Sequence, residues 1–410
     1  RLARTVDLCG IPERDPVHTA PLMKMPPSVF DEIDQPTLVL DEGTARRNIH
    51  HMAEKARRFG LRFRPHFKTH QSAVIGEWFR EAGVSQITVS SVEMAEYFAE
   101  NGWNDILIAF PVNIRQIGRI QSLAQRIHLG VLVENTAGVE ALGQMQEAEA
   151  EVWVKIDVGA HRTGIDWQDV SAAASLCHQV NQIPALHLKG LLTHSGHTYS
   201  ARSTSEILEL FSETLLRLHF MKQELAAMGI EPLEVSVGDT PGCTLAENFE
   251  GADEIRPGNF VFYDVHQLSL GVCTFEEIAV VVACPVVAIH PEREEAVIYG
   301  GAVHLSKETV QWQGEETYGL ICLPESSGWS APLLDAYVAR LSQEHGILHY
   351  PLAAMRNHPV AVGDLVLILP AHSCLAVQAL GQYRTLEGYK IRTMLKPYAA
   401  ELHADDQMEE

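Results

Sequence analysis

Lys68 stands at the end of a short extended run, RFRPHF (62–67), with a histidine two residues to either side, His66 and His70. Most lysines that follow a strand are simply solvated. Such a lysine can also bind a phosphate as a cation, or act as an amine nucleophile that forms a Schiff base, for which burial or nearby positive charge lowers an amine's pKa. The segment alone leaves all three uses open, so the surrounding elements have to decide between them.

Short β-rich runs alternate with amphipathic stretches between Arg62 and Phe262, and these are the elements that must position Lys68. Apolar residues in the stretches recur at three- and four-residue intervals, which is the period of a helix. About eight such units over roughly 200 residues predict a closed parallel (β/α)8 barrel. An open doubly wound sheet is the alternative, because a strand count from one sequence can be wrong by about one or two. The eight runs are RFRPHF, QITVS, ILIAF, RIHLGVLV, VWVKIDV, LHLKGLLTH, LEVSV and EIRPGNFVF.

A second domain is predicted after about residue 275, where strands with short Gly, Pro and Asp turns replace the helical period. Its predicted strands include IAVVVACPVVAIH, DLVLILPAH and LAVQALGQY, and we expect mainly antiparallel pairing. Residues 1–35 hold five prolines and little periodicity, so we expect an extended arm there. The chain therefore divides into an arm (1–35), a barrel (36–270) and a β domain (271–410). The strand PTLVLD (36–41) is a candidate to pair with the β domain.

Polar and glycine residues follow the predicted barrel strands where each strand ends, which is the rim that carries chemistry in such barrels. GDTPG could expose backbone N–H groups at a helix start, a usual receptor for a phosphate. Taken alone, such a turn is more often a plain turn, and a single histidine is more often a satisfied structural group. Convergence of these groups on one rim favours a site for a cofactor. The candidates are Lys68, Arg162, His194, His197, Tyr199, Gly238, Thr240, Arg256 and Gly258.

The composition indicates which kinds of molecule the protein can bind. The 410 residues carry a formal net charge of −22, which would repel nucleic acid and anionic membranes, so we expect a small-molecule substrate. No apolar run approaches the roughly 20 residues that span a bilayer, and the first thirty residues lack the apolar stretch of a secretory signal. Seven cysteines without paired spacing are typical of reduced thiols. We expect a cytoplasmic enzyme that forms a homodimer.

Seven motifs follow one another between about Gln35 and Thr393: RPHFKTH, KIDVGAHRTG, LTHSGHTY, VSVGDTPG, EIRPGN, EHG and GDLVLILPAHSC. Together they resemble the D-threonine aldolase and D-serine dehydratase family of pyridoxal-phosphate enzymes, which share the alanine-racemase type (fold type III) of barrel plus β domain. The resemblance implies that Lys68 forms a Schiff base with pyridoxal 5'-phosphate and that GDTPG and RPGN hold its phosphate. It also implies that Arg162 faces the cofactor ring and that His197 and Tyr199 line the pocket.

A two-ligand metal site is predicted at PAHSCLAV, which closes a β run and offers His372 and Cys374. Side chains at i and i+2 of a strand point to one side, so the imidazole and the thiolate could meet one cation. In a β domain taken alone, a buried free cysteine beside an incidental histidine is the commoner case. The resemblance implies a divalent metal, since this branch of the family carries one at this motif. A thiolate with an imidazole favours zinc over magnesium or manganese.

These parts predict a lyase acting on a β-hydroxy D-amino acid, most simply a dehydratase of the D-serine or 3-hydroxyaspartate type that yields a 2-oxo acid and ammonia. Lys68 would take the α-proton, and the metal would turn the β-hydroxyl into a leaving group. The nearest alternative is an aldolase that breaks the Cα–Cβ bond, with His194 or His197 as the base on the β-hydroxyl. By resemblance, however, aldolases of this group pair the metal-binding histidine with an aspartate, where this chain has Cys374. An amino-acid racemase and a non-catalytic pyridoxal-phosphate carrier are further alternatives.

Overall fold

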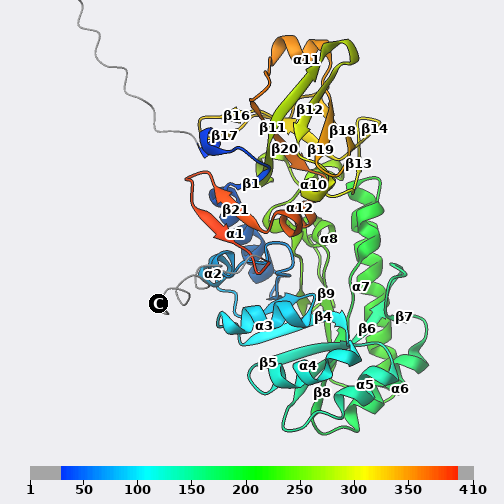
Figure 1. Cartoon of the computed structure of the whole chain (residues 1–410). Helices are drawn as coiled ribbons and strands as arrows, with labels where there is room; N and C mark the ends of the chain where they lie inside the picture. The colour runs from blue at the N-terminus through cyan, green and yellow to red at the C-terminus, as the bar shows by residue number, and fades with distance from the viewer. Residues whose placement is uncertain (1–28, 396–410) are drawn as a thin grey trace, which may run out of the picture.

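The structure, a computed structural model, describes residues 29–395. Of the arm expected over 1–35, residues 1–28 lie outside the described part, and the remainder begins with a short 3-10 helix, η1 (Val29–Glu32). Two bodies follow, a barrel wrapped in helices and a β domain that sits against one end of it (Figure 1).

The barrel contains eight parallel strands in the spatial order β2-β10-β9-β8-β6-β5-β4-β3. A parallel bridge between His66 and Thr88 joins the two ends of this order and closes the barrel. The predicted (β/α)8 architecture is confirmed, and the open doubly wound sheet is wrong. The strands are β2 (Arg62–Phe63), β3 (Ile87–Val89), β4 (Asp105–Pro111), β5 (His128–Val133), β6 (Ala150–Asp157), β8 (Leu186–Leu192), β9 (Glu234–Val237) and β10 (Glu254–Ile255), with β7 (Ile165–Asp166) paired to β6.

Helices cover the outside of the barrel, and most of them begin at a side chain that caps the helix. Asp41, Ser91, Asn135 and Ser203 each accept a hydrogen bond from a backbone N–H of the first turn, which replaces a bond that the helix cannot supply. The helices are α1 (Glu42–Arg58), α2 (Ala73–Glu81), α3 (Val92–Glu100), α4 (Ile117–Ala124), α5 (Thr136–Leu142), α6 (Val170–Asn181), α7 (Thr204–Ala227) and α8 (Thr240–Leu245). Among residues 29–395 no helix is both long and apolar enough to cross a membrane.

The β domain is built on one sheet in the order β12-β19-β18-β15-β20-β11-β1-β21-β22, and a second pairing of β12 with β11 curls part of it into a barrel. All these pairs are antiparallel except β1 with β21. The strand expected over 36–41 is β1, which lies in this sheet although the chain enters the barrel directly after it. The strands are β1 (Thr37–Leu40), β11 (Val280–His290), β12 (Glu295–Tyr299), β15 (Gly319–Cys322), β18 (Tyr337–Leu341), β19 (His345–His349), β20 (Leu365–Pro370), β21 (Gln382–Thr385) and β22 (Lys390–Arg392).

Smaller elements complete the domain and its junction with the barrel. Two hairpins project from the sheet, and short helices connect its strands. The hairpins are β13 (Val310–Trp312) with β14 (Glu315–Thr317), and β16 (Pro324–Glu325) with β17 (Gly328–Trp329). The helices are α9 (Val265–Ser269), α10 (Ala302–Leu305), α11 (Leu352–Asn357) and α12 (Ser373–Leu380).

One predicted strand is wrong. LAVQALGQY was expected to continue the sheet, but most of it lies in helix α12, and only its last two residues enter β21. The buried residues Ser373, Ala376 and Val377 have the i, i+3, i+4 spacing of one helix face. Gly381 then ends the helix in the left-handed conformation, with φ of 66°. A run that is apolar on nearly every residue does not distinguish a short buried helix from a strand.

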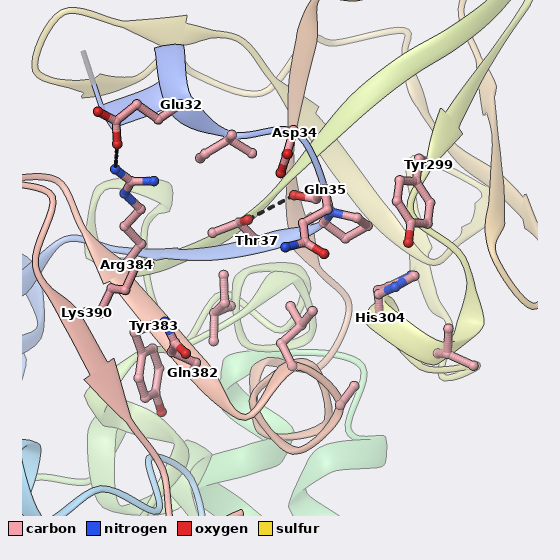
Figure 2. Close-up of a pocket in the computed structure, with 16 residues that line it drawn as sticks. Glu32, Asp34, Gln35, Thr37, Tyr299, His304, Gln382, Tyr383, Arg384 and Lys390 are labelled. Carbon is pink, nitrogen blue, oxygen red and sulfur yellow. Dashed lines mark hydrogen bonds and ion pairs between the residues drawn. The ribbon is translucent and has the colours of Figure 1, made fainter. Parts of the chain in front are cut away.

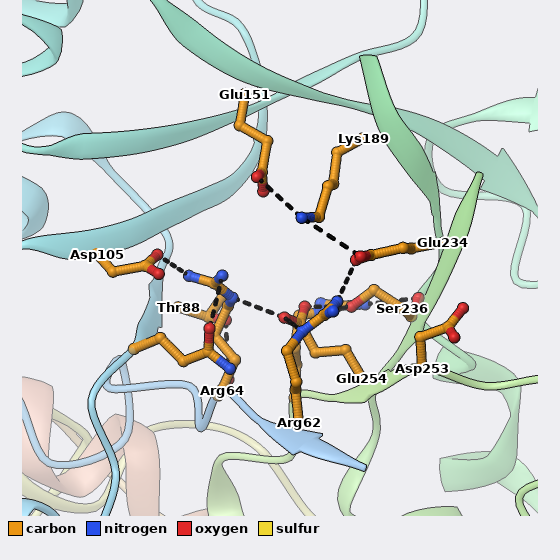
Figure 3. A network of polar contacts seen from close by, with 12 residues as sticks. Arg62, Arg64, Thr88, Asp105, Glu151, Lys189, Glu234, Ser236, Asp253 and Glu254 are labelled. Carbon is orange, nitrogen blue, oxygen red and sulfur yellow. Dashed lines mark hydrogen bonds and ion pairs between the residues drawn. The ribbon is translucent and has the colours of Figure 1, made fainter. Parts of the chain in front are cut away.

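A network of ion pairs and hydrogen bonds joins the strands at the end of the barrel that lies away from the β domain (Figure 3). Arg64 is 4% exposed and donates through Nε to Glu254, which is fully buried, at 2.9 Å, and through Nη1 to Asp105 at 2.5 Å. Arg62 bonds to Glu234, and Lys189 lies 3.3 Å from both Glu234 and Glu151. These ion pairs therefore join the start of β2 to the neighbouring strands.

Candidate active site

A cavity of about 520 Å³ lies at the carboxyl end of the barrel strands, where the β domain meets the barrel. This volume is in the range of small-molecule and cofactor sites. Of the residues expected to do chemistry, the structure brings nine to its wall and leaves two, His197 and Gly238, off it. The nine are Lys68, Arg162, His194, Tyr199, Thr240, Arg256, Gly258, His372 and Cys374.

A second cavity of about 420 Å³ opens in the β domain between β1, α12 and β21 (Figure 2). It contains none of the residues predicted to be functional. Its arginine, Arg384, forms an ion pair with Glu32. Because the larger cavity gathers residues from the ends of all eight barrel strands or the loops that follow them, the chemistry is assigned there.

Lys68 occupies a turn directly after β2, and its side chain faces the larger cavity. The residues that follow hold this turn in place. Gln71 adopts the left-handed conformation, with φ of 52°, and its side-chain amide donates to the Lys68 carbonyl at 3.1 Å. The backbone N–H of Lys68 donates to Nδ1 of His66 at 3.3 Å. The lysine therefore projects from a backbone that its neighbours fix.

His194 is held as a neutral imidazole. Its Nδ1 hydrogen bonds to the Gly238 carbonyl, and because a carbonyl can only accept, Nδ1 carries the proton and Nε2 keeps its lone pair. Burial, together with the positive charges of Lys68 and Arg162, lowers the pKa of His194 well below its ordinary value. The cavity therefore contains an uncharged histidine base.

The GDTPG loop and the RPGN loop come close together at one side of the cavity. A Cβ added at Gly238 would lie 2.9 Å from Cβ of Arg256, and one at Gly258 would lie 2.9 Å from both Cβ and O of His66, so both glycines permit contacts that a larger residue would block. The amide of Thr240 already donates to the Tyr199 hydroxyl at 3.2 Å. Its own hydroxyl Oγ1 is buried and finds no partner among the described residues, so it is free to donate to an anion.

Four buried polar atoms in the cavity wall lack a hydrogen-bond partner within residues 29–395. Buried polar groups are rarely left unpaired, so a wall with four of them indicates that the cavity normally contains a polar molecule. Arg256 adds positive charge beneath them; burial lowers its pKa to about 10, and it remains a cation at neutral pH. Only the Thr240 hydroxyl among the four atoms can donate, and together with the Arg256 charge it fits the phosphate of a cofactor, whereas the other three atoms are acceptors for donor groups of a bound molecule. The four atoms are Asp239 Oδ2, Thr240 Oγ1, Asn259 Oδ1 and Gln267 Oε1.

Arg162 reaches the mouth of the cavity from the loop after β6. Oδ1 of Asp157 accepts from the N–H groups of Gly159 and Ala160, both at 2.9 Å, and of His161 at 3.1 Å. Gly159 and His161 have φ of 120° and 52°, so the loop is bent back sharply. One carboxylate thus sets the loop that presents the Arg162 guanidinium to the cavity.

His197 lies in the 3-10 helix η3 (Gly196–Ser200) and its ring is not part of the cavity wall. Burial and the nearby Arg217 lower the pKa of His197. Tyr199, from the same helix, does reach the cavity and packs with its ring centroid 6.1 Å from that of His194. Of the two histidines considered as bases, His194 is therefore the one in contact with the cavity.

His372 and Cys374 meet at the start of α12 and not along a strand, so the strand geometry expected for this pair is wrong. His372 is the N-cap residue, and Cys374 lies in the first turn, where its thiol donates to the Thr69 hydroxyl at 3.4 Å. Burial would raise the pKa of the Cys374 thiol, but His372 and the nearby Lys68 lower it. A thiolate and an imidazole are the donors that zinc prefers. The described residues contain no group of three or more His, Cys, Asp or Glu side chains arranged to hold a metal, so a cation here would have two protein ligands and open positions.

Among the cavity residues that were not singled out from the sequence, Lys155 and Glu308 bear most directly on the chemistry. Lys155 lies within β6, where burial, with Arg256 and Arg162, lowers its pKa to about 7. A lysine inside the run VWVKIDV was the available signal, because alternate residues of a barrel strand point inward. Glu308 accepts from Nδ1 of His372 at 2.5 Å. It lies 64 residues away along the chain in a polar loop, and no motif marks it.

Comparison with known proteins shows which enzymes the chain is similar to. The chain is 29% identical over 363 residues to a D-threo-3-hydroxyaspartate dehydratase of Delftia sp. HT23, a match that covers 86% of this chain and 94% of the relative. The solved structure of that enzyme superposes with a TM-score of 0.82 at 27% identity and covers 89% of this chain and 98% of its own. A mutant of the same enzyme has been solved in a metal-free form, with a TM-score of 0.82 at 26% identity over 90% of this chain and 99% of its own.

Two further relatives extend the comparison. A D-serine dehydratase of Dictyostelium discoideum is 26% identical over 381 residues, which cover 87% of this chain and 94% of the relative. A 3-hydroxy-D-aspartate aldolase of Paracoccus denitrificans is 28% identical over 241 residues, which cover 57% of this chain and 61% of the relative. Dehydratases and aldolases are thus both similar to this chain, and the two dehydratases match it over the greater length.

Together with these relatives, the closed barrel, the cavity-facing lysine that follows its first strand and the antiparallel β domain identify a pyridoxal-phosphate-dependent lyase of fold type III. The chain belongs to the alanine racemase N-terminal domain family, whose model matches residues 40–265, more than half of its length. A putative serine dehydratase domain matches residues 279–386, which include His372 and Cys374.

Proposed function

We propose that the protein is a dehydratase of β-hydroxy D-amino acids, with pyridoxal 5'-phosphate on Lys68 and a divalent cation, zinc, on His372 and Cys374. The observation that carries the proposal is that Lys68 and the His372–Cys374 pair face one cavity from different domains. Elimination needs a base at Cα and an acid at the β-oxygen of one small substrate, and this arrangement provides a place for each.

The cofactor would be held by residues already described. Lys68 would bind its aldehyde carbon, the hydroxyl of Thr240 and the Gly258 loop would meet its phosphate, and Arg162 would face its ring from the cavity mouth. When bound, pyridoxal phosphate supplies an electron sink for negative charge at Cα. The Thr240 amide donates to the Tyr199 hydroxyl at 3.2 Å, which supports a place for both residues on the phosphate side of the cavity.

Lys68 then has the central proton-transfer role. Lys68 would hold the cofactor, and its amine, when free, would take the proton from Cα of the substrate. When bound, the cation supplies a Lewis acid for the β-oxygen, which makes hydroxide a tolerable leaving group. The overall reaction removes water across Cα–Cβ and then takes up water at the resulting enamine, so the products are a 2-oxo acid and ammonia.

Aldol cleavage is the second candidate, and His194 is the observation that favours it. Its neutral imidazole, with Nε2 unprotonated, could take the proton of the β-hydroxyl and release an aldehyde and glycine. Cys374 argues against aldol cleavage, because by family resemblance the aldolases carry an aspartate at this position.

The products formed from D-threonine and D-serine decide between the two reactions. Purified protein loaded with pyridoxal phosphate and Zn²⁺ is expected to release ammonia with 2-oxobutyrate from D-threonine and with pyruvate from D-serine. Glycine with acetaldehyde from D-threonine, or with formaldehyde from D-serine, would overturn the dehydratase in favour of the aldolase. An epimerised amino acid would identify a racemase, and no turnover of any substrate would identify a carrier.

The assembly, the compartment and the domain limits are also proposals. We propose a cytoplasmic homodimer, and light scattering of the holoenzyme tests the dimer. The six cysteines in the described part of the chain are all unpaired, which supports a reducing compartment. The two family matches end at residue 265 and begin at residue 279, which supports a boundary near 270 between a barrel (36–270) and a metal-carrying β domain (271–410).

A further inference from the structure

We propose that Glu308 is a positioning residue for the metal site, because its carboxylate holds the ring of His372 in the tautomer and orientation that present Nε2 to a cation. The inference rests on the proposed function, since it takes His372 and Cys374 as the metal ligands. Glu308 lies in the wall of the same cavity. Neither its position in the sequence nor any of the recognised motifs assigns it a role.

The hydrogen bond between the two side chains determines the tautomer. Nδ1 of His372 lies 2.5 Å from Oε2 of Glu308. A carboxylate oxygen accepts, so the proton sits on Nδ1, and in the neutral ring the lone pair is then on Nε2. A ligand histidine commonly donates its other ring N–H to a carboxylate, which fixes the ring and increases the basicity of the ligating nitrogen. Glu308 makes that contact here.

The loop that carries Glu308 is pinned on both sides of it. Ser306 adopts a left-handed conformation with φ of 72°, and its hydroxyl accepts from the Glu308 N–H at 3.2 Å. On the other side, the Thr309 hydroxyl donates to Glu316 at 2.7 Å across the β13–β14 hairpin. A non-glycine residue at such a φ costs energy, so the surrounding structure specifies this turn. The placement of Glu308 against His372 therefore follows from the backbone and not only from a mobile side chain.

A different group anchors the helix itself. Oδ2 of Asp264 accepts from the backbone N–H of Ser373 at 3.0 Å and from Nδ2 of Asn259 at 2.7 Å, which ties the start of α12 to the end of the barrel. Because Asp264 fixes the backbone of the metal loop, Glu308 is left to control the orientation of the imidazole. Removing Glu308 should therefore change metal binding without unfolding α12.

The alternative is an ordinary surface ion pair. The Glu308 side chain is 54% exposed and that of His372 is 30% exposed, and exposed pairs contribute little to stability. A mere surface pair would leave metal affinity unchanged on removal of Glu308. The two explanations therefore differ in the affinity for the cation, which can be measured without any turnover.

The test measures Zn²⁺ affinity by competition with a chromophoric chelator, on protein loaded with pyridoxal phosphate. Glu308→Ala is expected to weaken Zn²⁺ binding about ten- to a hundredfold. Glu308→Gln keeps an acceptor without the charge and should fall between that variant and the wild type. Glu315→Gln makes the same charge change at an exposed position of the β13–β14 hairpin, without touching His372 or the Thr309–Glu316 hydrogen bond, and should bind Zn²⁺ as the wild type does. The visible absorbance of the bound cofactor and the melting temperature should change little in all three.

A fourth variant separates this inference from the proposed function. Cys374→Ala removes a proposed ligand and should nearly abolish tight Zn²⁺ binding. If the wild type binds no Zn²⁺, or if Cys374→Ala binds it equally well, the proposed metal site is wrong and the role of Glu308 falls with it. If Cys374→Ala loses binding but Glu308→Ala matches the wild type, only the role of Glu308 is wrong.

Discussion

Two lysines face the same cavity, and their surroundings separate their roles. Nζ of Lys155 donates to the Ile156 carbonyl at 3.0 Å and to the Thr193 hydroxyl at 3.4 Å, inside the barrel. Lys68 extends from a turn at the rim, where its only recorded hydrogen bonds among residues 29–395 involve its backbone. Burial lowers the pKa of Lys155 to about 7, so it too could act as a nucleophile at neutral pH. The position of Lys68 at the rim of the cavity therefore favours it over Lys155 as the lysine that binds the cofactor.

Borohydride reduction of the holoenzyme and peptide mapping test this assignment. We expect the pyridoxyl group on Lys68, and we expect Lys68→Ala to lose turnover by at least about a hundredfold because it lacks the proton-transfer amine. Lys155→Gln is the matched control and should still carry the label on Lys68. Label on Lys155 in the wild-type protein would show that the wrong lysine was chosen.

At the residue scale the sequence could predict the groups that belong to short motifs. Lys68 and His372 stand in such motifs, and both reach the cavity. His197 stands in one too, yet its ring lies off the cavity, because a motif gives neighbours along the chain and not the direction of each side chain. Glu308 could not be predicted, since its contact with His372 depends on how a loop folds back onto another strand end.

At the scale of elements, helix α12 is where sequence and structure differ most. The alternation of eight strands with helices was predictable because several of the barrel helices, such as α1 and α7 with 17 and 24 residues, are long enough to show their period. Helix α12 has eight residues, and its mean composition is apolar, so periodicity alone could not distinguish it from a strand. The glycine at its end was the better signal, since a helix commonly stops at a residue in the left-handed conformation.

Two glycine substitutions test that interpretation with opposite signs. Gly381, with φ of 66°, ends α12, and Gly381→Ala should destabilise the protein by about 1 kcal/mol because an L side chain is strained there. Gly118 lies within α4 and an added Cβ would meet nothing within 4 Å, so Gly118→Ala should stabilise by about 0.5 kcal/mol. Melting temperatures measure both. A stabilising effect of Gly381→Ala would show that the helix does not end as described.

At the scale of the whole molecule, the cavity exists only because the two domains are in contact. Nε2 of Gln71, in the Lys68 loop, donates to Gln378 of α12 at 2.8 Å, and the Tyr383 hydroxyl donates to the His70 carbonyl at 2.7 Å. These partners are 307 and 313 residues apart in the chain. The sequence could predict both domains from their periodicities, but not the contacts between them, because no local pattern encodes a separation of that length.

The barrel end opposite the cavity holds the buried charges that should govern the acid stability of the whole protein. Burial would raise the pKa of Glu254, but the charge and hydrogen bond of Arg64 outweigh it, and the pKa lies below its ordinary value of 4.5. The unfolded carboxyl therefore binds a proton at a higher pH than the folded one. The stabilisation by Glu254 is then fully present above about pH 4.5 and is lost as the pH falls through the folded-state pKa.

Glu254→Gln should consequently destabilise the protein at pH 7 by about 3 kcal/mol, because it leaves Arg64 buried with only Asp105 as a charged partner. Glu247→Gln is the matched control: that carboxylate pairs with Arg58 at 2.6 Å, but both side chains are more than half exposed, so the loss should be within about 0.5 kcal/mol. Melting temperatures of the three proteins measured from pH 7 down to pH 3 provide the comparison. The deficit of Glu254→Gln should shrink below pH 4.5, since the carboxyl of the unfolded wild-type chain then takes up a proton and the folded carboxyl loses its charge only as the pH falls further. A deficit that stays constant over this range would mean that the variant acts through packing and not through the ion pair.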